Sequence, residues 1–179
     1  VPSGGFVVVD SSTSRPISLD QNARPLQYML PSENHYTSYD VAVGPNGELA
    51  GVVWGNESHP LQGFYLTDAQ RTKSTEFLAP TGKEPGKFSG PMGVGINSKG
   101  HVFVADTGNH RIQEFDEKGA FVQVIGKGDL RLPMKVTFDH KGDMFVADSG
   151  FNRIAVYSME TSGTWKLIRS MSDSLIREP

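Results

Sequence analysis

The chain has 179 residues, a formal net charge of -3 and no cysteine, which excludes a disulfide scaffold, a thiol nucleophile and cysteine-ligated zinc. No apolar run approaches the roughly 18 residues that cross a bilayer, and the near-neutral charge balance gives no global attraction to nucleic acid. The 20 glycines and 11 prolines predict many turns and argue against a helical bundle.

Four copies of one sequence unit follow each other along the chain. The first, incomplete copy starts at Gly4 with GGFVVVDSSTSR, and the second starts at Val41 with VAVGPNGELAGVVWGN. The third begins at Pro91 with PMGVGINSKGHVFVADTGNHRIQEF, and the fourth begins at Pro133 with PMKVTFDHKGDMFVADSGFNRIAVY. The last two copies align without a gap at a constant offset of 42 residues. Such a repeat decides the fold before any local pattern does.

Each unit contains four short runs rich in Val, Ile and Phe, separated by turn residues. In the third unit the predicted strands are Gly93–Asn97, His101–Asp106, Arg111–Asp116 and Phe121–Ile125. Four strands in about 42 residues are typical of a β-propeller blade. The sequence therefore predicts an all-β fold, a β-propeller of four-stranded antiparallel blades. The predicted blades, within one domain of residues 1–179, are 4–30 (incomplete), 39–80, 91–126 and 133–170.

The first unit opens at the second strand of a blade, so about 15 strands are expected. Because open blade edges invite aggregation, we expect the remaining blades of the propeller to come from a longer chain or from a second chain. Closure with four blades stays open as an alternative, and it would need the missing strand from elsewhere.

The third unit, and within it the string ADTGNHRI from Ala105 to Ile112, is very similar to the NHL repeat. The fourth unit replaces the Asn109-His110 doublet by Phe151-Asn152, and the unit at Val41 departs further. NHL domains are usually six-bladed, so the resemblance implies that four units are part of such a propeller. In animals the repeat commonly ends TRIM-type proteins, where it follows a RING, B-boxes and a coiled coil and recognises substrates or RNA. NHL repeats also occur in lyases.

Two charged positions recur in the units. Asp106 and Asp148 end a strand before a glycine loop, with Asp10 at the same position of the first copy, and Arg111 and Arg153 begin the next strand. A catalytic group is needed once, whereas a scaffold group is needed in every blade. We therefore interpret Asp10, Asp106, Arg111 and Asp148 as structural, with the carboxylates accepting backbone N–H bonds and pairing with arginine.

An enzyme is the less favoured interpretation. Neither a G-x-S-x-G elbow nor an H-E-x-x-H motif is present, and small apolar residues fill the inner strands, as at Val94–Ile96. The sequence predicts no catalytic residue, no metal ligand and no cofactor. A propeller lyase or hydrolase with an axial metal site stays open as an alternative, as does a purely structural assembly role.

The loops before each first strand and those between the second and third strands are predicted to share one face of the propeller. Cations between aromatic rings suit RNA, whether a single strand or a stem-loop, and equally a protein substrate. The resemblance implies that the chain is the recognition domain of a TRIM-NHL-type E3 ubiquitin ligase whose RING lies outside these residues. A cytoplasmic location is expected, since no signal peptide is visible. The binding candidates are Arg15, Tyr36, Trp54, His59, Lys83, Lys87, His110, Lys127, Arg131, Phe151 and Arg153.

Overall fold

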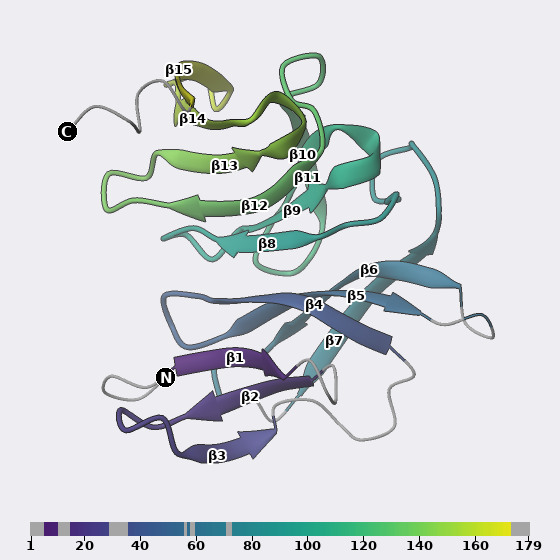
Figure 1. Cartoon of the computed structure of the whole chain (residues 1–179), viewed down its shortest axis with the longest axis vertical. Helices are drawn as coiled ribbons and strands as arrows, with labels where there is room; N and C mark the ends of the chain where they lie inside the picture. Colours follow the sequence, from purple (N-terminus) through teal and green to yellow (C-terminus); the bar gives the residue numbers. More distant parts are fainter. Residues whose placement is uncertain are drawn as a thin grey trace.

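The computed structural model describes residues 6–10, 15–28, 36–55, 57, 60–70 and 73–172 (Figure 1). These ranges form fifteen β-strands and two short 3-10 helices. All strand pairs are antiparallel, and consecutive strands are neighbours in every sheet. No helix in this part of the chain is long and apolar enough to cross a membrane.

The strands form one three-stranded and three four-stranded sheets, which confirms the predicted propeller blades. The first two sheets contain β1 (Phe6–Asp10), β2 (Arg15–Leu19) and β3 (Pro25–Tyr28), followed by β4 (Tyr36–Val43), β5 (Leu49–Gly55), β6 (Leu61–Thr67) and β7 (Ser74–Pro80). The third contains β8 (Gly93–Ile96), β9 (Val102–Asp106), β10 (Arg111–Phe115) and β11 (Phe121–Ile125). The fourth contains β12 (Pro133–Phe138), β13 (Met144–Asp148), β14 (Arg153–Met159) and β15 (Trp165–Ser172).

The blades are arranged around an axis formed by their first strands. Strand β8 lies between β4 and β12, and these three inner strands contact each other (Figure 1). The second strand of one blade also packs on the first strand of the next, as β5 does on β8 and β9 does on β12. Strand β1 packs on β4 in the same way. It therefore occupies the second position of its blade, as the repeat alignment predicts.

Glycine turns join the strands at the positions that the sequence predicts. Gly100 and Gly119 both have φ +82, in the left-handed region that glycine adopts at no steric cost. Asn97 and Asp116, three residues earlier, accept backbone N–H bonds from their own turns. The bonds from Ala120 and Lys118 lower the pKa of Asp116 below its ordinary value.

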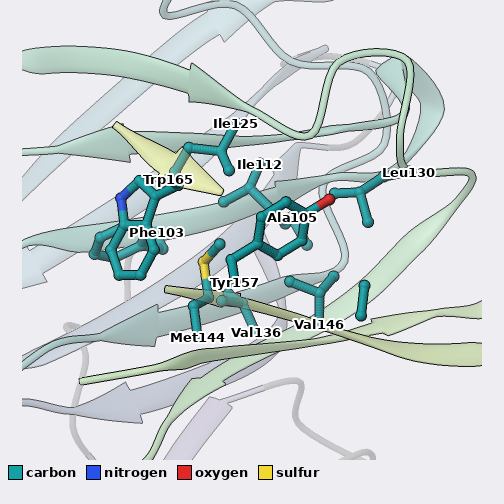
Figure 2. Close-up of a cluster of buried hydrophobic side chains, with 11 residues drawn as sticks. Phe103, Ala105, Ile112, Ile125, Leu130, Val136, Met144, Val146, Tyr157 and Trp165 are labelled. Carbon is teal, nitrogen blue, oxygen red and sulfur yellow. The ribbon is translucent and has the colours of Figure 1, made fainter. Parts of the chain in front are cut away.

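The hydrophobic core lies between neighbouring blades. One cluster joins the second and third blades, and in it Phe64 contacts Phe88 and Phe115. A second cluster joins the third and fourth blades, where Phe103 meets Trp165 edge to face (Figure 2). Each blade therefore buries its apolar face only against a neighbour, as expected of a repeat architecture.

Candidate functional site

The loops before the first strands and the loops between the second and third strands meet on one face, here called the loop face. The Thr107 hydroxyl donates to the Pro133 carbonyl oxygen at 2.6 Å. The Gly108 N–H donates to Ser89 at 2.8 Å, and the Gly150 N–H donates to Arg131 at 2.7 Å. Backbone bonds thus tie the two kinds of loop together, and this is the arrangement that the binding hypothesis requires.

A buried ion pair beneath the loop face holds the loop that precedes the third blade. Asp106 is fully buried, and its carboxylate accepts from Arg111 Nε at 2.8 Å and from the Ser89 N–H at 2.7 Å. The rest of the Arg111 guanidinium donates to the carbonyl oxygens of Lys83, Glu84 and Lys87 at 2.8–3.1 Å. Asp106 and Arg111 are thereby satisfied by the scaffold and are not available to a ligand.

The fourth blade repeats this arrangement, but its arginine, Arg153, is more exposed than Arg111. Asp148 accepts from Arg153 Nε at 2.8 Å and from the Arg131 N–H at 2.7 Å, and Arg153 also donates to the Asp129 carbonyl oxygen. The Arg153 guanidinium lies 5.0 Å from the centre of the Phe151 ring, which is 49% exposed. Arg153 is therefore a scaffold cation that supports an exposed aromatic ring.

The NHL motif doublet has a structural use as well. The Asn109 amide donates to Asp106 at 2.9 Å and to the Gly82 carbonyl oxygen at 2.8 Å. His110 has a left-handed φ of 56, and its Nδ1 accepts the Leu132 N–H at 3.1 Å. Asn152 adopts the same conformation in the fourth blade, with φ 50. Histidine and asparagine tolerate this conformation better than β-branched residues do.

The second blade fastens its loops with different side chains. Val53 and Gly63 stand where the third blade has Asp106 and Arg111. Gln62 Oε1 instead accepts the Gly90 N–H at 2.6 Å, and the Trp54 indole N–H donates to the Pro91 carbonyl oxygen at 2.7 Å. Trp54 therefore makes the bond that Thr107 makes one blade later. Its alignment with Thr107 in the repeat is the signal that could have shown this.

Part of the third unit matches a known family of repeats. The NHL repeat family model matches residues 88–115, which run from Phe88 through the buried Asp–Arg pair to Phe115. This segment is similar to an NHL repeat. The fourth unit shares its strands, turns and loop bonds with this one, and the second unit shares its four-stranded sheet.

Three curated proteins share parts of this sequence. The B-box type zinc finger protein ncl-1 of Caenorhabditis elegans is 39% identical over 98 residues, which are 51% of this chain and 11% of that protein. Protein brain tumor of Drosophila melanogaster is 53% identical over 36 residues, 20% of this chain and 4% of that protein. The human E3 ubiquitin-protein ligase TRIM32 is 40% identical over 47 residues, 26% of this chain and 7% of that protein. These similarities confirm the resemblance to NHL proteins of the TRIM type, and this chain spans only a small part of each relative.

Solved structures support the same fold. The Nidogen/Laminin complex matches with a TM-score of 0.71 and 15% identity, over 96% of this chain and 60% of that chain. A regucalcin from Agrobacterium tumefaciens matches with a TM-score of 0.66 and 14% identity, over 96% of this chain and 58% of that chain. At this identity the likeness concerns the fold alone.

The structure divides the binding candidates into four groups. Trp54 and Arg153 are half-buried and committed to scaffold bonds. Lys87 lies 3.3 Å from Glu84, whose own backbone N–H, followed by Lys87, holds the pKa of that carboxyl below its ordinary value. The side chains of Asp10, Arg15 and Tyr36, and the whole of His59, lie outside the described residues. The exposed candidates on the loop face are Lys83, His110, Lys127, Arg131 and Phe151.

Charge differs between the two faces of the third and fourth blades. On the loop face, residues 81–92 and 126–132 carry four cationic and two acidic side chains. The turns on the opposite face, 97–101, 116–120, 139–143 and 160–164, carry five acidic side chains and three lysines. The loop face is therefore locally basic in a chain whose net charge is -3.

The axis is more polar than the sequence analysis predicts. Lys135 Nζ, on β12, lies 2.5 Å from the Asp40 carboxylate on β4 and donates to the Val94 carbonyl oxygen at 3.1 Å. Asp40 also accepts the Val94 N–H at 2.9 Å. The expectation that only small apolar residues occupy the inner strands is wrong here, because Asp40 and Lys135 cap the backbone of β8. In the described residues, no three His, Asp or Glu side chains are placed to hold a metal ion.

Proposed function

We propose that this chain is a recognition module without catalytic activity, and that its loop face binds single-stranded RNA. The observation that carries the proposal is the excess of cationic side chains on the face that also carries the exposed Phe151 ring. RNA recognition needs both features, because cations neutralise phosphates and aromatic rings stack on unpaired bases.

Lys83, Lys127 and Arg131 are the proposed phosphate contacts. Their side chains are exposed, whereas their loops are fixed from below by Arg111 and Asp148. Loops held by buried bonds present their charges with little loss of conformational freedom on binding. Phe151, whose ring is exposed in the fourth blade, supplies the stacking surface.

A protein partner is the second candidate. Leu132 and Met134 are 39% and 37% exposed. Phe151 lies in the loop whose Ser149 hydroxyl donates to the Leu132 carbonyl oxygen at 2.7 Å. Exposed apolar side chains of this kind serve as anchors in protein interfaces. In both cases we propose a cytoplasmic parent chain that acts as a TRIM-type E3 ubiquitin ligase, since the E3 ubiquitin-protein ligase TRIM32 is similar to part of this sequence.

Neutralising two proposed phosphate contacts is expected to weaken RNA binding and its salt dependence. In the Lys127→Gln/Arg131→Gln double variant, the negative slope of log K against log salt should become shallower by about 1.4, because each phosphate contact on a single strand contributes about 0.7 to its magnitude. Fluorescence anisotropy with a labelled random-sequence RNA, over a series of salt concentrations, measures this slope.

The matched control is Lys118→Gln with Lys141→Gln, which removes the same charge from the opposite face. It should bind RNA as the unaltered chain does. Equal slopes for both double variants would contradict the proposal, as would the absence of RNA binding. A partner protein bound with affinity independent of salt would favour the second candidate.

A further inference from the structure

A cavity opens on the loop face between the second and third blades. Its volume is about 410 Å³, within the range typical of ligand pockets. The residues that line it include Trp54, Gln62, Thr81, Ser89 and Gly90. None of them belongs to the buried Asp–Arg pairs, and Trp54 and Gln62 also bond to the loop before the third blade.

One wall of the pocket is a fixed aromatic ring. The polar atom of the Trp54 indole is bound to the Pro91 carbonyl oxygen at 2.7 Å. The Tyr39 ring packs against the indole with 4.6 Å between ring centres, and Gly90 lies against its edge. The indole is therefore held in one orientation and offers the pocket only apolar ring surface.

The rim of the pocket carries hydrogen-bonding groups with spare capacity. The Gln62 amide donates one N–H to the Thr81 hydroxyl and accepts the Gly90 N–H through its oxygen. An amide nitrogen has two protons and a hydroxyl has one. The second Gln62 N–H and the hydroxyl protons of Thr81 and Ser89 are not used in these bonds, so they can bind a polar ligand edge.

We propose that this pocket takes one unpaired nucleobase of the bound RNA. The inference rests on the proposed RNA-binding function and adds a second, base-directed subsite to it. A nucleobase has apolar faces and a polar edge, as this pocket has an apolar wall and a polar rim. Lys83, in the loop that contributes Thr81 and Ser89, is exposed and supplies a cation for the adjoining phosphate. An aliphatic anchor of a protein would leave the polar rim unpaired.

The proposal is tested by filling the pocket and by observing its tryptophan. Thr81→Tyr places an aromatic ring in the pocket from an exposed rim position and leaves Trp54 in place. It should weaken binding of the random-sequence RNA about tenfold or more, since stacking on an aromatic residue is worth roughly 5- to 150-fold per base. The salt slope should stay unchanged, because no phosphate contact is removed. Thr164→Tyr, at an exposed threonine of the opposite face, is the matched control and should bind normally.

Tryptophan fluorescence separates base stacking from anion binding. RNA should quench the emission of the unaltered chain, and inorganic polyphosphate, which has charge but no bases, should not. Trp54→Phe should abolish the quenching; the other tryptophan, Trp165, is buried in the core between the third and fourth blades.

RNA could bind with a normal salt slope, yet without quenching and without an effect of Thr81→Tyr. This result would overturn the proposal that the pocket binds a nucleobase, and the proposed RNA-binding function would stand. Binding of an aromatic peptide that Thr81→Tyr blocks, at unchanged RNA affinity, would assign the pocket to a protein. Failure of RNA to bind at all would instead remove the proposed function itself.

Discussion

Replacing Asp106 by alanine is expected to lower the free energy of unfolding by about 3–5 kcal/mol, the usual result of removing one partner from a buried ion pair. The Asp106 side chain is fully buried and that of Arg111 is 8% exposed. Without the carboxylate, the Arg111 charge stays buried, and the Ser89 N–H and the Asn109 amide lose their acceptor. Equilibrium denaturation in urea measures the change.

Asp148→Ala is the matched comparison in the next blade. Its partner Arg153 has an 18% exposed side chain and a second contact with the Phe151 ring, so water can solvate the guanidinium after the substitution. The loss of stability should therefore be smaller than for Asp106→Ala. Equal losses would show that burial of the arginine is not the cause. Asp116→Ala removes an acceptor of two backbone N–H bonds in a surface turn and should destabilise the chain less than either of these variants.

The strands and turns of this fold could be predicted from the sequence because the repeat supplies several independent copies of each. Predicted strand ends in the third unit differ from those of β8, β9 and β10 by one residue. Aligned glycines marked the turns at Gly100 and Gly119, where φ is positive. Local chemistry was sufficient at these positions, since a turn depends on a few neighbouring residues.

The candidate site could be predicted only in part, because its groups depend on the neighbouring blade. Trp54 is predicted to be a binding anchor, and the structure adds a bond from its N–H to the Pro91 carbonyl oxygen that no local pattern contains. The axial pair of Asp40 and Lys135 joins residues 95 positions apart. Their relation becomes visible once Asp40, Gly93 and Lys135 are aligned as the same position of three successive units. The choice between RNA and protein depends on which charges are exposed, and this is a property of the assembled face.

Gly93→Ala is expected to cost about 3 kcal/mol, the upper part of the range for overpacking. A Cβ at this position would lie 2.3 Å from the Met134 carbonyl oxygen and 2.8 Å from Lys135 Cα. Both atoms belong to the backbone of β12, so no side chain can rotate away and the inner strands must separate. The same displacement would draw Lys135 away from Asp40, because the lysine reaches its partner across the strand that contains Gly93. Gly142→Ala is the control: nothing lies within 4 Å of its Cβ position, and only its φ of +89 is strained, for about 1 kcal/mol. Urea unfolding of both variants measures the difference, and equal losses would mean that β8 and β12 tolerate a wider spacing. Asp40, Gly93 and Lys135 occupy the same repeat position in three successive blades. If the prediction holds, the missing side chain at Gly93 is what lets Lys135 reach Asp40 across the middle blade.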